Sequence, residues 1–576
     1  MSEAKSLEDI LLTIQKPGRY TGGEWNSVRK VWTKDKVKFL LAFPDLYEVA
    51  MSHLGIKILY GILNDREDVL CERVFAPWAD FEKALRENKV PLSSLESRKA
   101  LKEFDIIGFS LAYELSYTNV LNILDLGGIP LRSSERTDED PIVIAGGPCC
   151  YNPEPMADFV DAFVIGDGEE IIGEIVEAYK GTGLFGRSVE SKGKGLREDF
   201  LRKLAGIQGV YVPSLYKVEY NEDMTVKSFL PVEDCFPGSI KKRVVRDLDA
   251  AYYPTKQIVP NIQVVHDRIT IEIMRGCKHA CLFCQASAVY RPLRQRSKET
   301  ILSLAAKTYE RTGYDEISLL SLSSGDHPDI IDITKELNGI FKSRSVSISL
   351  PSLRVEDIAE HLPALVSEVK KSGLTFAPEA ASQPLRNSIN KNIDMDKLFR
   401  AVTGSYKLGW RRVKLYFMIG LPGEKEADLI EIPVLVNKIS GLRREIGGGA
   451  ANVAVSINAF IPKPHTVFER EAMDTQESLS AKRDLLKNTL RSKFVELSFH
   501  PVVMGRMEAV FSRGDRRLSG VIIASWISGA RFDGWQEVFS MDLWLAAFKD
   551  SGIDPDFYSS RKRPEDEILP WDFIKI

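Results

Sequence analysis

Short apolar runs alternate with amphipathic stretches of helical length along most of the chain. In the first third, these runs span residues 37–43, 69–75, 104–111, 142–145 and 159–165. Runs of this length, separated by helical stretches, are typical of a parallel sheet that is covered by helices on both faces. The sequence therefore predicts a doubly wound, Rossmann-like α/β domain, whose ligands would sit beyond the carboxyl ends of the strands.

A second series of strand-like runs follows a turn-rich connector. Its members span residues 269–274, 316–322, 346–350, 374–377, 413–419 and 453–460. Six βα units in succession predict a partial (β/α)6 TIM barrel. In such a barrel the chemistry belongs to the loops at the carboxyl ends of the strands.

These patterns divide the chain, whose 576 residues exceed what one compact core usually holds. We expect an amino-terminal arm, a Rossmann-like domain, a connector with a β-rich linker, the barrel, and an α/β carboxyl-terminal extension. The boundaries expected for these five parts are residues 1–35, 36–180, 181–260, 261–465 and 466–576.

Composition narrows the class of protein. Hydrophobic residues make up 44% of the chain, charged residues make up 27%, and the net charge is -4. This composition excludes a disordered chain, a coiled coil and a collagen-like fibre. The near-zero charge balance argues against wholesale wrapping of nucleic acid. No segment approaches the roughly 20 consecutive apolar residues of a membrane span, so we expect a cytoplasmic protein with no membrane partner.

Three of the seven cysteines lie close together, directly after the first predicted barrel strand. Cys277, Cys281 and Cys284 have the spacing Cys-x3-Cys-x2-Cys. In a reducing compartment such a trio is a ligand set rather than a disulfide pair with a spare, and soft thiolates at this spacing can wrap one metal centre. A structural zinc site normally closes with four ligands, and no second pair follows at the usual spacing. The trio therefore suits a four-iron cluster with one open iron.

With the aromatic Phe283 before its last cysteine, the motif resembles that of the radical S-adenosylmethionine (SAM) enzymes. The resemblance implies that Cys277, Cys281 and Cys284 hold a [4Fe-4S] cluster, and that the amino and carboxylate groups of SAM bind the open iron. One electron, from a donor such as flavodoxin or ferredoxin, would then cleave SAM to methionine and a 5'-deoxyadenosyl radical. Cluster and SAM would carry the chemistry, and no catalytic residue is assigned beyond the cluster.

The resemblance also implies SAM contacts at later strand ends. The implied residues are Ser324, Gly325, Asp326, Glu379, Ser382, Arg386 and Gly420. Asp326 stands where many relatives have the acid of Gly-Gly-Glu, which receives the SAM amino group. Relatives contact ribose or carboxylate near Glu379, and Arg386 could pair bidentately with the carboxylate. Gly420 begins a stretch that resembles the adenine-side glycine motif.

The first domain resembles the cobalamin-binding module that precedes the barrel in one large radical SAM subclass. The implied cobalamin contacts are Ser110, Leu111, Gly146, Gly147, Gly166, Gly168 and Glu169. Many cobalamin enzymes outside this subclass carry Asp-x-His-x-x-Gly, whose His binds cobalt, but the nearest segment here, 51–56, lacks both the Asp and the Gly. We therefore expect bound cobalamin to have its own base displaced, and His53 not to coordinate cobalt. Segments 17–20 and 531–535 further resemble a largely uncharacterised branch of this subclass. This resemblance does not indicate a substrate.

The predicted function is radical-initiated modification of an unactivated carbon, in particular methylation through cobalamin. One alternative keeps the radical step but leaves the cobalamin domain without function, with rearrangement, dehydrogenation or methylthiolation as the reaction. Methylthiolation would need a second cluster on three separated amino-terminal cysteines, whereas Cys71, Cys149 and Cys150 are more typical of buried small hydrophobes. The alternative from another class is an iron-sulfur protein that binds nucleic acid or acts as a sensor, and never cleaves SAM.

Positive charge gathers around the cysteine loop and bears on the substrate. The residues are Arg275, Lys278, Arg291, Arg294, Arg296 and Lys298. They could steer RNA or a phosphorylated metabolite toward the loop, or they could form internal salt bridges and a solvated face. The basic segment 513–517 allows the same two interpretations. A peptide is a further possible substrate, and the sequence leaves this choice open.

Overall fold

The computed structural model describes residues 6–186, 195–351 and 374–576. Its first sheet has the strand order β2-β1-β3-β4-β5-β6. The strands are β1 (Val37–Phe43), β2 (Val69–Phe75), β3 (Ile106–Ser110), β4 (Ile142–Gly146), β5 (Ala162–Val164) and β6 (Val210–Tyr211). The neighbouring pairs are parallel, except that β6 runs antiparallel to β5. The predicted Rossmann-like sheet is confirmed, and its order reverses between β1 and β3, where such sheets open a ligand crevice.

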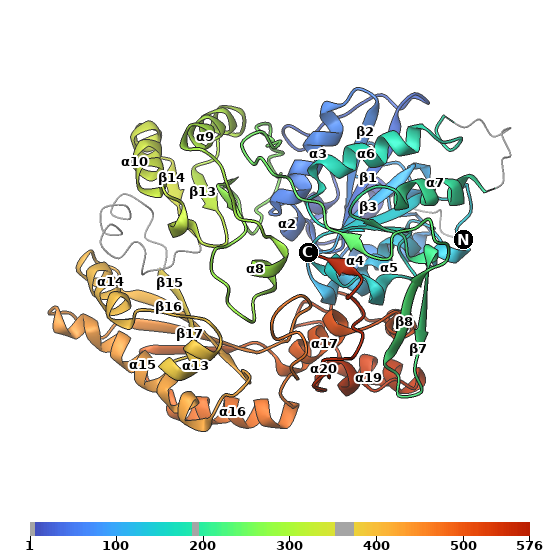
Figure 1. Ribbon diagram of the computed structural model, residues 1–576. Coiled ribbons are helices and arrows are strands. Elements are labelled where there is room, and N and C mark those ends of the chain that lie inside the picture. Colours follow the sequence, from blue (N-terminus) through green and yellow to red (C-terminus); the bar gives the residue numbers. More distant parts are fainter. Residues whose placement is uncertain (1–5, 187–194, 352–373) are drawn as a thin grey trace.

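Helices cover both faces of this sheet. Helix α3 (Leu54–Asp65) packs beside α6 (Gly168–Lys180), and α4 (Ala79–Asn88) packs beside α5 (Tyr117–Leu126). Figure 1 shows the two pairs on opposite sides of the sheet. Each helix has one apolar face: in α3, for example, Ile56, Tyr60 and Leu63 are buried at helical spacing.

The second part of the chain forms two parallel sheets, with the orders β10-β13-β14 and β15-β16-β17-β18. Their strands are β10 (Ile269–Glu272), β13 (Glu316–Leu320), β14 (Ser347–Ser349), β15 (Leu374–Glu379), β16 (Arg412–Ile419), β17 (Asn452–Ala459) and β18 (Val495–Phe499). The six predicted strands are present. The seventh, β18, was not predicted, because it is a short edge strand that is only partly buried.

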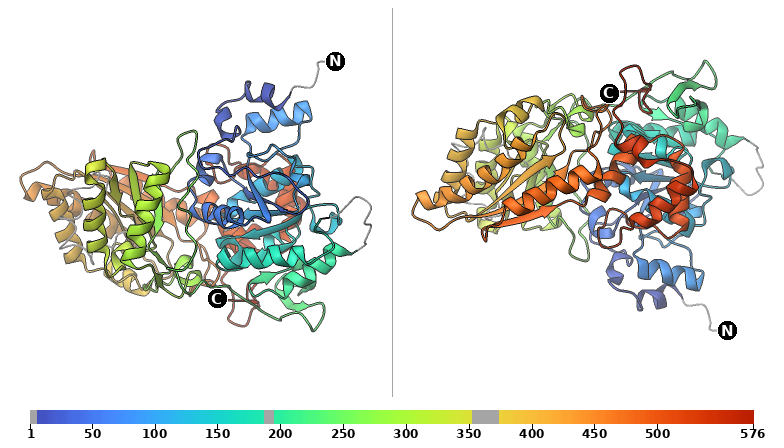
Figure 2. Two further views of the ribbon diagram at one scale, coloured as in Figure 1. Left: turned by 90° about the horizontal axis from the view of Figure 1, so that it is seen from above. Right: turned by 90° about the horizontal axis from the view of Figure 1, so that it is seen from below.

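Helices lie on the outer side of these sheets, and three of the five begin at a residue whose side chain caps the helix. The helices are α9 (Lys298–Thr312), α10 (Ile330–Phe341), α14 (Met395–Lys407), α15 (Glu426–Glu445) and α16 (Gln476–Thr489). Ser297, Asp394 and Thr475 each accept a backbone N–H at the start of α9, α14 and α16, respectively. Figure 2 shows the barrel strands and these helices as one lobe, separate from the lobe of the first domain.

The carboxyl-terminal helices pack mainly on the first domain, and α17 also contacts α16 of the barrel lobe. They are α17 (Val502–Arg513), α18 (Leu518–Ile527), α19 (Met541–Asp550) and α20 (Pro555–Ser559). Most of their buried apolar side chains belong to the same core as those of the first sheet, whereas Val502 and Ala509 of α17 belong to the core of the β15–β18 sheet. The Phe511 ring, for example, lies 5.7 Å from that of Tyr117 in α5 and 4.9 Å from that of Trp544. The last strand, β19 (Ile574–Lys575), pairs with β9 (Ile240–Lys241) of the linker.

The basic segment 513–517 is structural. The Arg513 guanidinium is fully buried and donates to the carbonyl of Ser559 over 2.7 Å. Arg516 pairs with Glu154 over 3.1 Å, and Arg517 pairs with Asp515 over 2.6 Å. Of the two interpretations of this segment, internal pairing is the one the structure supports. Among the described helices, none is long and apolar enough to cross a membrane.

The amino-terminal arm is fixed to the first domain by a buried charge triad. Glu24 of the arm lies 2.9 Å from the Arg73 guanidinium of β2, and Glu96 lies 2.6 Å from it on another side. All three side chains are 1% exposed. Burial alone would lower the pKa of Arg73, but the two carboxylates hold it well above its ordinary value.

This triad predicts a large stability cost for Arg73→Ala. The substitution leaves two carboxylates buried without their cation, which costs about 3 to 5 kcal/mol. Arg86→Ala is the matched control: Arg86 also pairs with two acids, Glu82 and Asp125, but is 40% exposed, so we expect a loss within about 1 kcal/mol. Chemical denaturation followed by circular dichroism measures both. Equal losses for the two variants would contradict the assigned role of the triad.

Candidate functional site

The cysteine loop, residues 276–284, connects β11 (Met274–Arg275) to α8 (Gln285–Val289). It begins at Gly276, whose φ is +92° and where a Cβ would lie 2.8 Å from the Tyr290 carbonyl oxygen, so only glycine fits. It ends at Cys284, which caps α8 by accepting the Ser287 N–H at its sulfur over 3.4 Å. A tight turn and a helix start therefore fix the two ends of the loop.

The three cysteines of this loop are free thiols and interact electrostatically. Burial raises the pKa of Cys284, and the charges of Cys281 and Cys277 raise it further. Thiolates that repel one another in a partly buried loop are the kind of donor set that a metal centre stabilises. In the described part of the chain, no three Cys, His, Asp or Glu side chains are grouped as they would be to hold a metal ion. The donor chemistry of the trio nevertheless fits an iron-sulfur cluster.

Asp326 holds the loop from the side of β13. It lies in the short helix η8 (Ser324–Asp326), and its carboxylate is 2% exposed. One oxygen lies 2.8 Å from the Lys278 ammonium, and the other lies 2.8 Å from Nε2 of His279. The residue predicted to receive the SAM amino group is therefore ion-paired to the cysteine loop.

Residues 389–391, which we call the 389–391 brace, contact the loop from the side of β15. The Leu282 amide donates to the Ile389 carbonyl over 3.1 Å, and the Asn390 side chain donates to the Ala280 carbonyl over 2.7 Å. Lys391 lies 3.4 Å from Glu379. This brace was not predicted from the sequence. The polar residues that follow the fourth barrel strand were its only signal.

The other residues predicted to bind SAM lie at the carboxyl ends of β13, β15 and β16, the same edge of the parallel strands as the loop. Ser324 is buried and donates to the Pro351 carbonyl over 2.8 Å, next to Gly325. Glu379 has a left-handed φ of 66° at the end of β15. Gly420 has a φ of +80°, and its N–H donates to Glu424 over 2.9 Å. Their SAM contacts stay predictions.

The short helix α13 (Gln383–Ser388) carries the last two of these residues. Ser382 caps it and also donates to Asp428. The Arg386 guanidinium is 2% exposed and donates to the carbonyls of Ala380 and Ala381. Burial lowers the pKa of Arg386. In this structure its two terminal nitrogens donate within its own turn, and the carboxylate contact stays a prediction.

A pocket of about 650 Å³ lies between the carboxyl edge of the first sheet and the barrel. Of the residues predicted to bind cobalamin, the structure brings six to this pocket: Ser110, Gly146, Gly147, Gly166, Gly168 and Glu169. Leu111 is buried behind Gly147, where a Cβ would lie 2.6 Å from the Leu111 carbonyl oxygen. The barrel side contributes Glu272, Arg275, Gly276 and Tyr290. Because Gly276 precedes Cys277, the pocket reaches the cysteine loop.

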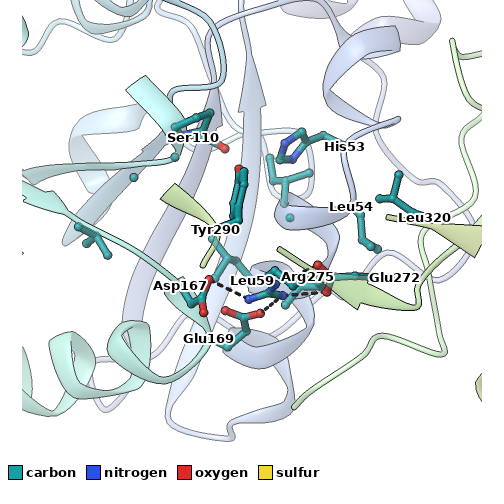
Figure 3. Close-up of a pocket in the computed structure, with 18 of the residues that line it drawn as sticks. His53, Leu54, Leu59, Ser110, Asp167, Glu169, Glu272, Arg275, Tyr290 and Leu320 are labelled. Carbon is teal, nitrogen blue, oxygen red and sulfur yellow. Dashed lines mark hydrogen bonds and ion pairs between the residues drawn. The ribbon is translucent and has the colours of Figure 1, made fainter. Parts of the chain in front are cut away.

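Buried ion pairs join the two sides of this pocket, as Figure 3 shows. Arg275 lies 3.0 Å from Asp167 and 2.6 Å from Glu169 of the first domain, and 2.8 Å from Glu272 of β10. Arg294 also pairs with Asp167. Burial opposes the charge of Arg275, but these carboxylates hold its pKa above the ordinary value.

The basic residues around the cysteine loop are therefore largely occupied within the chain. Besides Arg275 and Arg294, Lys278 pairs with Asp326 and Lys298 pairs with Glu336. Arg296 is buried and donates to backbone carbonyls, including that of Glu272 over 3.1 Å. The sequence allowed either substrate steering or internal salt bridges as the role of these residues. The structure shows that most of them form internal salt bridges.

His53 lines the same pocket and takes no part in the Arg275 ion pairs (Figure 3). Its Nδ1 atom is buried and has no hydrogen-bond partner among the described residues. Burial lowers the pKa of His53 to about 4, so the imidazole is neutral at physiological pH.

Two family models match the chain. The radical SAM superfamily model matches residues 271–433, and the model of the N-terminal domain of radical SAM proteins matches residues 55–213. An uncharacterized protein of Methanocaldococcus jannaschii is 28% identical over 516 residues, which is 89% of this chain and 97% of that protein. The ribosomal protein uS12 methylthiotransferase RimO of Elusimicrobium minutum is 22% identical over 42% of this chain and 57% of its own.

Two solved structures resemble the fold at low identity. The radical SAM methyltransferase TsrM from Kitasatospora setae, with cobalamin and a [4Fe-4S] cluster bound, is 15% identical, with a TM-score of 0.48 over 73% of this chain and 75% of its own. The cobalamin-dependent SAM radical enzyme OxsB is 13% identical, with a TM-score of 0.47 over 89% of this chain and 72% of its own.

The superfamily model begins within β10 and runs through the cysteine loop into α15, so it includes the trio and most of the strand ends described above. Membership implies a [4Fe-4S] cluster and SAM as cofactors, in agreement with the donor set of the loop. The chain belongs to the radical SAM superfamily and is a radical SAM enzyme with the N-terminal domain that accompanies the superfamily barrel.

Proposed function

We propose that this radical SAM enzyme binds cobalamin in the pocket between its two lobes and methylates an unactivated carbon. The observation that carries the proposal is the continuity of the pocket. One cavity is lined at one end by Ser110, Gly146 and Gly166, where cobalamin was predicted, and at the other by Gly276 of the cysteine loop. A cofactor held there would lie between the first sheet and the cluster.

The inner part of the pocket suits a large, partly apolar cofactor. Phe39, Leu41 and Ile144 of the sheet line it, together with Ile171 of α6. Gly108 keeps this part of the strand surface free of a side chain, since a Cβ there would lie 2.9 Å from the Phe39 ring. A slot between sheet and helices could take the displaced base of cobalamin, and polar groups at the strand ends could meet the amide-bearing periphery.

Bound together, these groups would supply a 5'-deoxyadenosyl radical from SAM and a methyl group from cobalamin. The chain itself would position them and exclude water. Cys277, Cys281 and Cys284 would hold the cluster, and Asp326 and the brace would keep the loop in place. The Arg275 ion pairs would fix the first domain against the loop, so that both cofactors share one closed space.

The cysteines of the first domain favour methylation over methylthiolation, the reaction of the RimO relative. A second cluster there would need three cysteines, so Cys71 would have to bind it together with Cys149 and Cys150. Cys71 lies on β2 and the pair follows β4, three strand positions away, which is roughly 14 Å. All three are buried free thiols, with pKa values raised first by burial.

For partners, we propose a flavodoxin or ferredoxin as electron donor. An RNA, a peptide or a phosphorylated metabolite would be the substrate.

The cluster assignment predicts the outcome of a SAM cleavage assay. Anaerobically reconstituted protein, given SAM and a low-potential reductant, should form 5'-deoxyadenosine, and Cys281→Ala should reduce it to background because one iron loses its thiolate. Cys235→Ala, which replaces an exposed cysteine outside the loop, is the control and should match wild type. 5'-Deoxyadenosine that persists in Cys281→Ala would contradict the cluster role. A cluster-loaded wild type that forms none in the presence of candidate substrates would favour the sensor alternative.

Filling the pocket should abolish cobalamin binding. Gly146 lines the pocket, and a Cβ there meets only Val164, at 3.7 Å, so Gly146→Leu projects side-chain volume into the cavity without a backbone clash. We expect hydroxocobalamin affinity, followed by visible absorbance, to fall at least tenfold while iron content stays at the wild-type level. Gly339→Leu, at an exposed position with no atom within 4 Å, should bind like wild type. Undiminished binding by Gly146→Leu would place cobalamin elsewhere.

The buried Nδ1 atom of His53 leads to a prediction for the spectrum of bound cobalamin. Coordination through Nε2 would leave an N–H at Nδ1, which is buried with no acceptor among the described residues; such a buried donor costs about 1 to 3 kcal/mol. We therefore expect His53→Ala to leave the absorbance and electron paramagnetic resonance (EPR) spectra of bound cob(II)alamin unchanged. Nitrogen superhyperfine splitting in wild type that disappears in His53→Ala would show that the imidazole does bind cobalt.

A further inference from the structure

Lys391 is the cationic residue of the 389–391 brace, and the backbone around it is fixed. Its amide donates to the Arg386 carbonyl over 2.8 Å, and the preceding Asn390 takes a left-handed φ of 53°. The side chain is only 13% exposed, and its ammonium lies 3.4 Å from Oε1 of Glu379. A charge held in such a place is weakly screened by water and acts strongly on its surroundings.

The cysteine loop is part of those surroundings. The two residues before Lys391 each make a hydrogen bond to the loop, at Leu282 and Ala280. Lys391 therefore directly follows a segment that two hydrogen bonds hold against the loop. On the other side of the loop, the positive charge of Lys278 is balanced by the buried carboxylate of Asp326, 2.8 Å away.

Glu379, the partner of Lys391, is itself held in a strained backbone conformation. Glu379 has a left-handed φ of 66° at the end of β15, a conformation that is unfavourable for a non-glycine residue. The irregular pairing between β15 and β16 lies at this residue. This backbone holds the Glu379 carboxylate against the Lys391 ammonium. The hydrogen bonds of Ile389 and Asn390 to the loop fix the backbone that carries the Lys391 side chain.

We propose that Lys391 is a positioning residue whose charge sets the reduction potential of the cluster. The proposal rests on the proposed function, since it presupposes a [4Fe-4S] cluster on the three cysteines. Reduction adds one electron from an external donor, and therefore one negative charge, to a cluster already bound by thiolates. A cation fixed beside the loop stabilises the more negative state and raises the potential. The brace keeps that cation in place.

A potentiometric titration of the full-length protein tests this role. Wild type, Lys391→Met, Lys391→Arg and Lys407→Met are reconstituted anaerobically, assayed for iron and sulfide, and titrated without SAM while the EPR signal of the reduced cluster is recorded. We expect Lys391→Met to have a more negative potential than wild type at equal iron content, and Lys391→Arg to restore the wild-type value. Lys407, exposed at the end of α14, is the control and should leave the potential unchanged. Equal potentials in wild type and Lys391→Met would overturn the proposal.

Glu379→Gln provides a second test that does not depend on Lys391→Met holding its cluster. It removes the negative partner but keeps the cation, so the potential should become less negative than in wild type. An unchanged or more negative potential would overturn the role of Lys391. A wild-type protein that assembles no [4Fe-4S] cluster would instead refute the proposed function. The two failures are therefore distinct.

Discussion

The buried charge of Arg275 determines how the two lobes of the molecule meet. It immediately precedes the cysteine loop, and its guanidinium contacts carboxylates of both lobes: Asp167 and Glu169 from the first domain, and Glu272 from the barrel. Taking several charges out of water is costly, and their mutual attraction only approximately repays that cost. These ion pairs add little net stability. However, any arrangement of the two lobes that leaves one of the charges unpaired is strongly destabilised. Their contribution is therefore to the geometry of the interface.

The shape of the pocket follows from this junction. The turn that carries Asp167 and Glu169 also carries Gly166, which lines the cavity and whose φ of +109° brings the chain against the backbone of Arg243. The Arg243 amide donates to the Ile165 carbonyl over 2.8 Å, so the linker between the lobes is fixed to the same turn. The turn at residues 166–169, the linker and the cysteine loop thus form one connected unit. A cofactor bound at the first sheet would face the cluster at a distance that the fold sets.

Much of this architecture could be predicted from local sequence, because strands, helix caps and tight turns depend on nearby residues. The runs of residues 37–43 and 413–419, for example, correspond to β1 and β16, and the spacing of the cysteines identified the loop. Strand β18 escaped prediction because its exposed face interrupts the apolar pattern. The partners of the basic residues could not be predicted either: Glu169, which pairs with Arg275, is 106 positions earlier in the sequence.

The 389–391 brace shows the same limit within the site. Its contacts join residues 110 positions apart and depend on the left-handed backbone of Asn390, neither of which leaves a pattern in one sequence. Sequence reasoning chose Arg386 because a guanidinium matches a carboxylate. Only the structure shows that the donors of Arg386 bind the Ala380 and Ala381 carbonyls, five and six residues earlier.

A second buried charge limits how far the lobes can move apart. After β17 the chain returns to the first domain, where the Lys463 ammonium lies 2.7 Å from Glu114 and 2.8 Å from Glu508 of α17. Burial would lower the pKa of Lys463, but the two carboxylates raise it above its ordinary value. Opening the pocket by rotating the barrel would strain either this junction or that of Arg275, and separating a buried pair costs several kcal/mol, on the order of 3 to 5. The space between the first sheet and the cysteine loop is therefore largely preformed.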